Sequence, residues 1–179
     1  NENQKVYYHK LGTDQSQDQL IYEDPAHPLR GIYASTTEDE RFLMLFLSDG
    51  ATNNNALKIK DLSKPNSKFV DIVTTFDNSY NVVDNVGDQL LVLTNNGKKK
   101  KKLVRIDVNK PSKEFWSVVI PEKEEVLNSV TMVGGKLFAS YLKDASSKIE
   151  IYSLEGQGIG EVSLPGIGTA SDIMGKNED

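Results

Sequence analysis

Two histidines are the residues of this sequence best suited to acid–base chemistry, and the segments around them argue against catalysis. Hydrolysis by a serine needs its hydroxyl beside an imidazole that a carboxylate orients. His9 lies in a strand-like segment beside Tyr7 and Tyr8, and His27 lies in a proline-flanked linker. The 179 residues contain no Gly-x-Ser-x-Gly segment, which is the usual setting of the serine in α/β-hydrolases. We therefore expect no catalytic residue in this chain.

A metal site is also not expected. The sequence has no cysteine and only two histidines, whereas a zinc site normally gathers three or four ligands. The segment from Asp49 to Asn55 is rich in oxygen-bearing side chains, as calcium loops are, but it lacks the glutamate that closes such a loop. We expect a polar hairpin loop there, and neither a metal ion nor a cofactor in the chain.

Three polar segments remain as candidates for binding. The glycines from Gly156 to Gly160 have the spacing of a phosphate-binding loop, but no helix follows them, so we expect a hairpin turn. The run Lys98–Lys102 could attract phosphates or acidic lipid, but sites for nucleic acid usually interleave aromatic residues with the basic ones. We expect an exposed, solvated loop at these lysines, and another at residues 122–125.

The composition excludes several classes of protein. A net charge of −5 argues against a nucleic-acid-binding protein, which usually carries a basic surplus. No run of about 18 apolar residues is present to span a membrane. The first residues have neither the basic nor the apolar region of a signal peptide. We expect a soluble protein, and the cytoplasm and the periplasm both remain open.

The elements that must position these residues are arranged as an internal repeat of about 46 residues, a length typical of propeller blades. In each repeat a segment that is apolar on both alternating faces precedes a segment with one polar face. The apolar segments are residues 41–47, 89–93 and 136–141, and their half-polar successors are residues 56–60, 103–107 and 148–152. Turn signals such as Asn96-Gly97 separate the strands, and no window has the apolar period of a helix.

The repeat predicts an all-β partial propeller of about three complete four-stranded antiparallel blades plus parts of two flanking blades. The expected blades are residues 30–76, 77–123 and 124–165. Residues 1–29 are expected to form the C-terminal half of a preceding blade and a linker, and residues 166–179 to begin a following blade. Because strand edges in incomplete blades lack partners, we also expect self-association.

Four segments carry a resemblance to a known family. In Lys5–Asp18 a tyrosine-rich strand is followed by Leu-Gly-Thr and a Ser-x-Asp turn, and the likeness continues through residues 36–42, 76–78 and 119–122. In these residues and their order the chain resembles the propeller of the prolyl oligopeptidases, also called prolyl endopeptidases. At Lys98–Lys102 it departs from the family, which usually has a short loop with proline and asparagine.

The resemblance implies a serine peptidase in which a propeller covers an α/β-hydrolase domain, admits short proline-containing peptides and excludes folded proteins. The family's catalytic triad has no counterpart in this chain, so the expected partner is an α/β-hydrolase domain of the same parent protein. Ala51 matches a family position on the rim of the substrate cavity. The alternative is a free-standing propeller that binds a protein or ligand on its rim.

Overall fold

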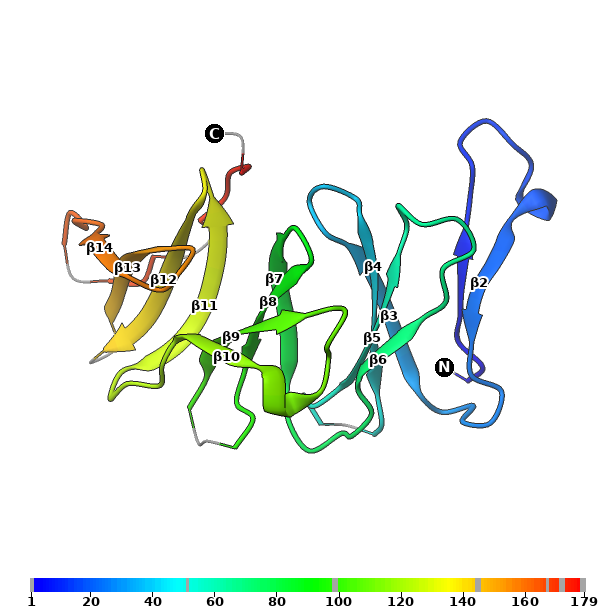
Figure 1. Ribbon diagram of the computed structural model, residues 1–179, viewed down its shortest axis with the longest axis horizontal. Helices are drawn as coiled ribbons and strands as arrows, with labels where there is room; N and C mark the ends of the chain where they lie inside the picture. Colours follow the sequence, from blue (N-terminus) through cyan, green and yellow to red (C-terminus); the bar gives the residue numbers. More distant parts are fainter. Residues whose placement is uncertain are drawn as a thin grey trace. The chain divides into compact units, whose positions relative to one another are not determined.

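The computed structural model describes residues 2–50, 52–97, 100–143, 146–166, 168–170 and 173–177. The chain divides into two compact units, residues 1–78 and residues 79–179, which are described here one at a time. Both units consist of antiparallel β-sheets (Figure 1). No helix in the described part of the chain is long and apolar enough to cross a membrane.

The first unit contains a two-stranded and a four-stranded sheet. The two-stranded sheet is a hairpin whose strands are joined through a short 3-10 helix, η1, and the four-stranded sheet is a meander in the order β3-β4-β5-β6. The elements are β1 (Lys5–Tyr8), η1 (Gln15–Gln17), β2 (Gln19–Glu23), β3 (Gly31–Thr36), β4 (Phe42–Ser48), β5 (Ala56–Asp61) and β6 (Val70–Val73).

The second unit contains two four-stranded meanders, in the orders β7-β8-β9-β10 and β11-β12-β13-β14. The elements of the first meander are β7 (Tyr80–Val86), β8 (Gln89–Thr94), β9 (Lys102–Asp107), the 3-10 helix η2 (Lys113–Phe115) and β10 (Ser117–Ile120). Those of the second are β11 (Val126–Val133), β12 (Lys136–Lys143), β13 (Ser146–Ser153) and β14 (Gly158–Glu161).

These sheets confirm the all-β class and the four-stranded antiparallel units expected from the repeat. The strand expected near the C-terminus is not seen: residues 166, 168–170 and 173 are not in a strand, and residues 167, 171 and 172 lie outside the described residues. Part of this segment instead hydrogen-bonds to the start of β13, where the Ser147 amide donates to the Gly168 carbonyl at 2.8 Å.

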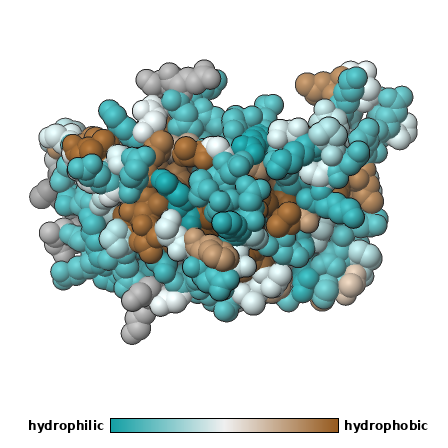
Figure 2. All heavy atoms as spheres, viewed as in Figure 1, coloured by the Kyte–Doolittle hydropathy of each residue, from teal (hydrophilic) through white to brown (hydrophobic). Residues whose placement is uncertain are grey.

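Strands that are apolar on both faces form the centre of each four-stranded sheet. In β8, four consecutive residues from Leu90 to Leu93 are at most 2% exposed, so both faces of the strand are buried. Each such side chain stabilises the fold by about 1.5–3 kcal/mol when it leaves water. In the view of Figure 2, hydrophilic residues cover most of the surface and apolar residues show between them.

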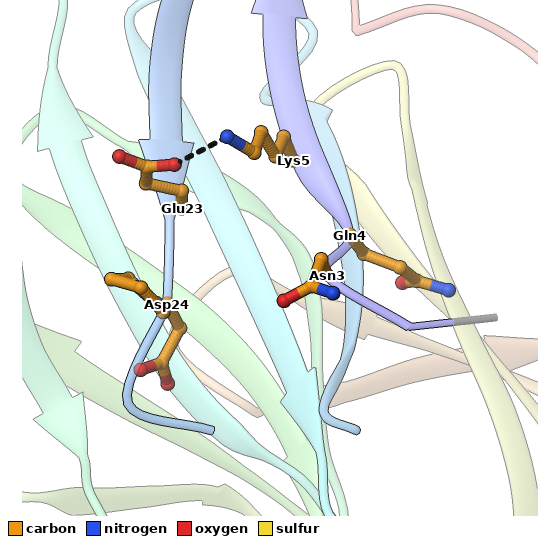
Figure 3. A pocket seen from close by; sticks show the side chains of 6 residues that line it. Asn3, Gln4, Lys5, Glu23 and Asp24 are labelled. Carbon is orange, nitrogen blue, oxygen red and sulfur yellow. Dashed lines mark ion pairs between the residues drawn. The ribbon is translucent and has the colours of Figure 1, made fainter. Parts of the chain in front are cut away.

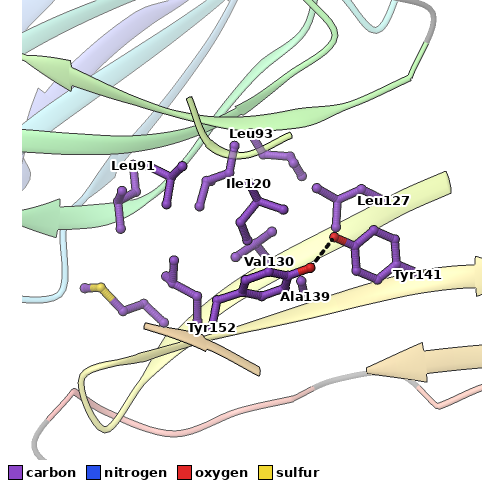
Figure 4. Packing of buried hydrophobic residues seen from close by; sticks show 12 residues of the cluster. Leu91, Leu93, Ile120, Leu127, Val130, Ala139, Tyr141 and Tyr152 are labelled. Atoms are coloured by element: carbon purple, nitrogen blue, oxygen red, sulfur yellow. Dashed lines mark hydrogen bonds between the residues drawn. The ribbon is translucent and has the colours of Figure 1, made fainter. Parts of the chain in front are cut away.

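The main core cluster of the second unit includes residues from both of its sheets (Figure 4). Its buried members are Leu91, Leu93, Leu103, Val119, Ile120, Leu127, Val130, Met132, Leu137, Ala139, Tyr141 and Tyr152. In the first unit, a cluster around Leu45, Leu47 and Ala56 joins the hairpin to the four-stranded sheet through partly buried Val6 and Tyr22. Burial of apolar side chains thus fixes the positions of the strands.

The turn between β13 and β14 lies directly against β10. Gly156 has a φ of +89°, and a Cβ at this position would lie 2.0 Å from the carbonyl oxygen of Val119. The guanidinium of Arg105 donates to the Leu154 carbonyl in the same turn at 2.5 Å. The turn therefore requires glycine both for its backbone conformation and for its close approach to the neighbouring sheet.

We expect Gly156→Ala to lower the free energy of unfolding by about 2 kcal/mol or more, since the left-handed conformation alone costs about 1–2 kcal/mol and the added methyl meets the β10 backbone. Gly87→Ala is the matched control, because Gly87 also has a positive φ, of +58°, but open space around its Cβ position. Urea denaturation of both variants measures the difference. Equal losses would show that the contact with Val119 is not a constraint.

Candidate functional site

Each histidine is held by a carboxylate within its own turn. The His9 Nδ1 lies 2.6 Å from the Asp18 carboxylate across the β1–β2 hairpin. The His27 Nδ1 lies 2.9 Å from Asp24, whose other oxygen accepts from Arg30 at 3.0 Å. The hydrogen bond with His27 is the main reason why the pKa of Asp24 is below its ordinary value. These pairs lie in separate turns of the first unit and stabilise the linker and the hairpin.

The loop motifs have structural roles where the structure describes them. The glycine-rich segment is the β13–β14 hairpin, as expected, and the Ser153 hydroxyl accepts from the backbone amides of Glu155 and Gln157. Ala51, the expected rim position, lies outside the described residues. Among the residues that are described, no group of three or more His, Asp or Glu side chains is placed to hold a metal ion.

The first unit has a pocket and a groove, and neither contains a complete histidine–aspartate pair. A pocket of about 120 Å³ at the start of β1 is lined by Asn3, Gln4, Lys5, Glu23, Asp24 and Pro25 (Figure 3). Lys5 and Glu23 form an ion pair of 2.7 Å in its wall, and the Gln4 side chain accepts from the Ile32 amide at 2.7 Å. A larger groove of about 630 Å³ is lined by Val6, Tyr7, Tyr8, Ile21, Ala34, Ser35, Thr36, Glu40, Leu43 and Leu62.

A polar cluster of the second unit is centred on Glu150 in β13. Its Oε2 accepts hydrogen bonds from the Lys123 ammonium and from the Tyr152 hydroxyl, and its Oε1 accepts from Lys148 at 2.9 Å. Tyr141 and Tyr152 place their hydroxyl oxygens 3.2 Å apart (Figure 4). Since the Tyr152 hydroxyl donates to Glu150, it accepts from Tyr141. The cluster is a continuous hydrogen-bonded chain at the border of the core.

The same cluster holds the Lys123 ammonium over aromatic faces. Its Nζ lies 4.5 Å from the ring centroid of Tyr141 and 5.6 Å from that of Tyr152, both within the range of a cation–π interaction. The Lys123 side chain is 30% exposed and that of Glu150 only 17%. The charge pair is therefore partly shielded from water, where it is worth more than an exposed pair.

The electrostatics follow from this packing. Burial raises the pKa of Glu150, but the hydrogen bonds from Lys123, Tyr152 and Lys148 outweigh it and lower the pKa to about 2. Burial and the hydrogen bond to Glu150 raise the pKa of Tyr152 to about 12. Burial also raises the pKa of Tyr141, helped by its hydrogen bond with Tyr152. At neutral pH the cluster thus combines an ionised carboxylate with two neutral phenols.

Lys123 belongs to residues 121–125, here named the connector, which joins β10 to β11. Because consecutive strands of a meander run in opposite directions, the β8–β9 loop and the connector leave the β7–β10 sheet at the same end. Two lysines confirm this placement: Lys100 donates to the Glu124 carbonyl, and Lys101 lies 3.5 Å from the Asn128 carbonyl. Lys98 and Lys99 lie outside the described residues.

These contacts change two interpretations of the sequence. Lys123 was expected in a solvated loop, but its side chain lies over Tyr141 and Tyr152 of the core cluster of the second unit. Lys100 and Lys101 were expected to be solvated, but they contact the backbone of the next segment. No short sequence pattern could predict these contacts, because the partners are far apart in the sequence: Lys123 and Glu150, for example, are separated by 27 residues. The alternation of Glu150 and Tyr152 with apolar residues in β13 indicates only that they share a face of the strand.

Comparisons with known proteins give one consistent result. Residues 1–179 match the family model described as the prolyl oligopeptidase N-terminal β-propeller domain. A prolyl endopeptidase of Elizabethkingia meningoseptica is 41% identical over 175 residues, which is 98% of this chain and 24% of that protein. The chain thus spans about a quarter of the length of this relative.

Solved structures agree with this result. A prolyl endopeptidase from a study of inter-domain dynamics in two such enzymes matches with a TM-score of 0.93 and 36% identity, over 100% of this chain and 26% of that one. Prolyl oligopeptidase B of Galerina marginata, bound to a 35mer hydrolysis and macrocyclisation substrate, matches with a TM-score of 0.89 and 26% identity, over 99% of this chain and 26% of that one.

Glu150 should make the free energy of unfolding depend on pH in the acidic range. Because its pKa in the folded state, about 2, is below the ordinary 4.5, its contribution is complete above about pH 4.5 and is lost as the pH falls towards 2. We expect Glu150→Gln to lower the free energy of unfolding by about 1–3 kcal/mol at pH 7, with a difference from the parent chain that shrinks below pH 4.5.

Urea denaturation at a series of pH values measures this dependence. The control is Glu114→Gln, at an exposed position in η2, which should change stability by less than about 0.5 kcal/mol at every pH. A Glu150→Gln variant whose stability falls in parallel with that of the parent chain between pH 5 and pH 2 would exclude this role for the carboxylate.

Proposed function

We propose that this chain, which belongs to the prolyl oligopeptidase family as part of its N-terminal β-propeller domain, is the non-catalytic, substrate-filtering portion of a serine endopeptidase that cleaves short peptides after proline. The observation that carries the proposal is the match of the whole chain to one quarter of solved prolyl endopeptidases, with a TM-score of 0.93. One such relative has been solved with a bound 35mer substrate, which supports peptides as the substrate class.

The physical basis of filtering is the contrast between strands and loops. Buried strands fix the ends of each sheet, and the polar loops at those ends set the width of any opening. A filter of this kind discriminates by size and flexibility and needs no reactive group. We propose that residues 30–76, 77–123 and 124–165 are the three blades, and that Ala51 contributes to the rim of the substrate cavity.

The partner in this proposal is an α/β-hydrolase domain of the same parent protein, which would supply the serine, aspartate and histidine. The nucleotide sequence beyond the codon for Asp179 tests it directly. We expect further blades, then a Gly-x-Ser-x-Gly-Gly segment and a late histidine. A stop codon after the blades would instead support a free-standing binding propeller. The compartment is proposed to be the cytoplasm or the periplasm.

The parent protein should have peptidase activity, and this chain alone should have none. We expect the parent protein to hydrolyse a chromogenic Gly-Pro substrate and a short proline-containing peptide, but not the same peptide sequence displayed within a folded protein. The 179-residue chain alone should give no turnover, because catalysis requires an activated nucleophile. Turnover by the purified chain that is lost on mutation of one of its own serines would contradict the proposed non-catalytic role.

We also propose that the chain by itself associates with other copies. Within the described residues β1 pairs with β2 alone, so its other edge has no strand partner there, and the Tyr7 and Tyr8 side chains of β1 are more than half exposed. An open edge of this kind is a template for pairing with another strand. Analytical ultracentrifugation from low to high concentration should show a dimer or larger species. A single monomeric species throughout would refute the association.

A further inference from the structure

Lysine side chains connect the connector of the second unit to the β11–β14 sheet and to the β8–β9 loop. Lys123 reaches out of the connector to Glu150 and over the rings of Tyr141 and Tyr152. Lys100, in the β8–β9 loop, donates to the carbonyl of Glu124. Lys101 contacts the Asn128 carbonyl at 3.5 Å, near the start of β11. Lys123 thus connects the connector to the β11–β14 sheet, and Lys100 and Lys101 connect the β8–β9 loop to the connector and to β11.

The connector contributes little to its own rigidity. It begins at Pro121, which has no backbone N–H to donate, and Pro121 and Glu124 are exposed while Glu122, Lys123 and Glu125 are only partly buried. Segments with few buried apolar contacts open at low free-energy cost. Its position therefore depends on side chains that connect it to its better-packed neighbours.

We propose that Lys123, Lys100 and Lys101 form a latch that fixes the connector against the β11–β14 sheet and the β8–β9 loop, and that release of this latch is the local opening motion of this end of the unit. If the chain filters substrates as proposed, this end of the unit borders the substrate cavity, and opening of the latch would then widen the entry for substrate. That consequence rests on the proposed function. The latch itself is a property of the isolated chain.

The three lysines do not contribute equally. Lys123 makes a charge-assisted hydrogen bond to a carboxylate that is mostly shielded from water, and it also lies over two aromatic rings. Lys100 and Lys101 are only partly buried and contact neutral carbonyls, where water and salt weaken the interaction. Lys123 is therefore the main fastening, and the other two reinforce it.

Cleavage by a glutamyl-specific endopeptidase tests the latch, since the connector carries Glu122, Glu124 and Glu125 and no lysine is needed for cleavage. We expect Lys123→Met to accelerate cleavage in the connector by about tenfold or more. The double substitution Lys100→Gln and Lys101→Gln should accelerate it by about two- to fivefold. Lys110→Gln, at an exposed lysine in the same unit, is the matched control and should have no effect.

Two further variants separate the latch from general stability. Lys123→Arg keeps the cation and should restore most of the protection. Tyr141→Phe keeps the ring beneath Lys123 and removes only a hydroxyl, so it should affect the connector less than Tyr141→Leu. The Lys123→Met variant should fold, because Glu150 retains Lys148 and Tyr152 as partners.

Hydrogen exchange measured by mass spectrometry gives the deciding pattern. We expect Lys123→Met to speed exchange at the amides of residues 122–128 while β8 and β12 remain protected. The proposal is overturned if connector cleavage and exchange are unchanged in that variant. It is equally overturned if exchange rises uniformly across the unit, because the lysine would then support the fold as a whole and not a local latch.

Discussion

Burial of both faces of the central strands is the constraint on which the rest of this structure depends. In β8 the side chains of Leu91 and Leu93 join the core of the second unit, and those of Leu90 and Val92 point to the opposite face, yet all four are almost completely buried. A sheet of this kind must be covered on both sides, which is the condition that a repeated stack of four-stranded blades satisfies. The apolar strands therefore determine the architecture.

This constraint also explains where polar chemistry is found. Inside the sheets, charged side chains would require expensive compensation. Some lie where a strand face meets a loop, as Glu150 does beneath the connector, and buried Asp84 within β7 accepts a hydrogen bond from the Asn177 side chain at 2.9 Å. The histidines follow the same rule, since each pairs with an aspartate in an exposed turn of the first unit. These polar groups position loops around a scaffold that apolar burial has already fixed.

The sequence predicts the scaffold better than the loops, and the reason is the range of the interactions. Strict alternation at residues 103–107 and continuous apolarity at residues 89–93 are local patterns, and they correctly indicate β9 and β8. The place of Gly156 against Val119 and of Lys123 against Glu150 depends on which strands become neighbours. A residue pattern of period two carries no information about such contacts, so residues 122–125 were interpreted only as a solvated loop.

A lysine ammonium held over aromatic rings and beside a carboxylate can fix a loop to a sheet because these interactions depend on direction, so they favour one position of the ammonium. Tyr141 donates to Tyr152, and Tyr152 donates to Glu150, so this chain of hydrogen bonds sets the orientation of both rings on the rigid β12–β13 pair. The ring faces and the carboxylate then define one place for the Lys123 ammonium. An apolar side chain would gain a similar burial energy from many positions, since the hydrophobic effect is non-directional. The hydrogen-bonded sheet thus determines the position of the connector, and through Lys100 and Lys101 that position is coupled to the preceding loop.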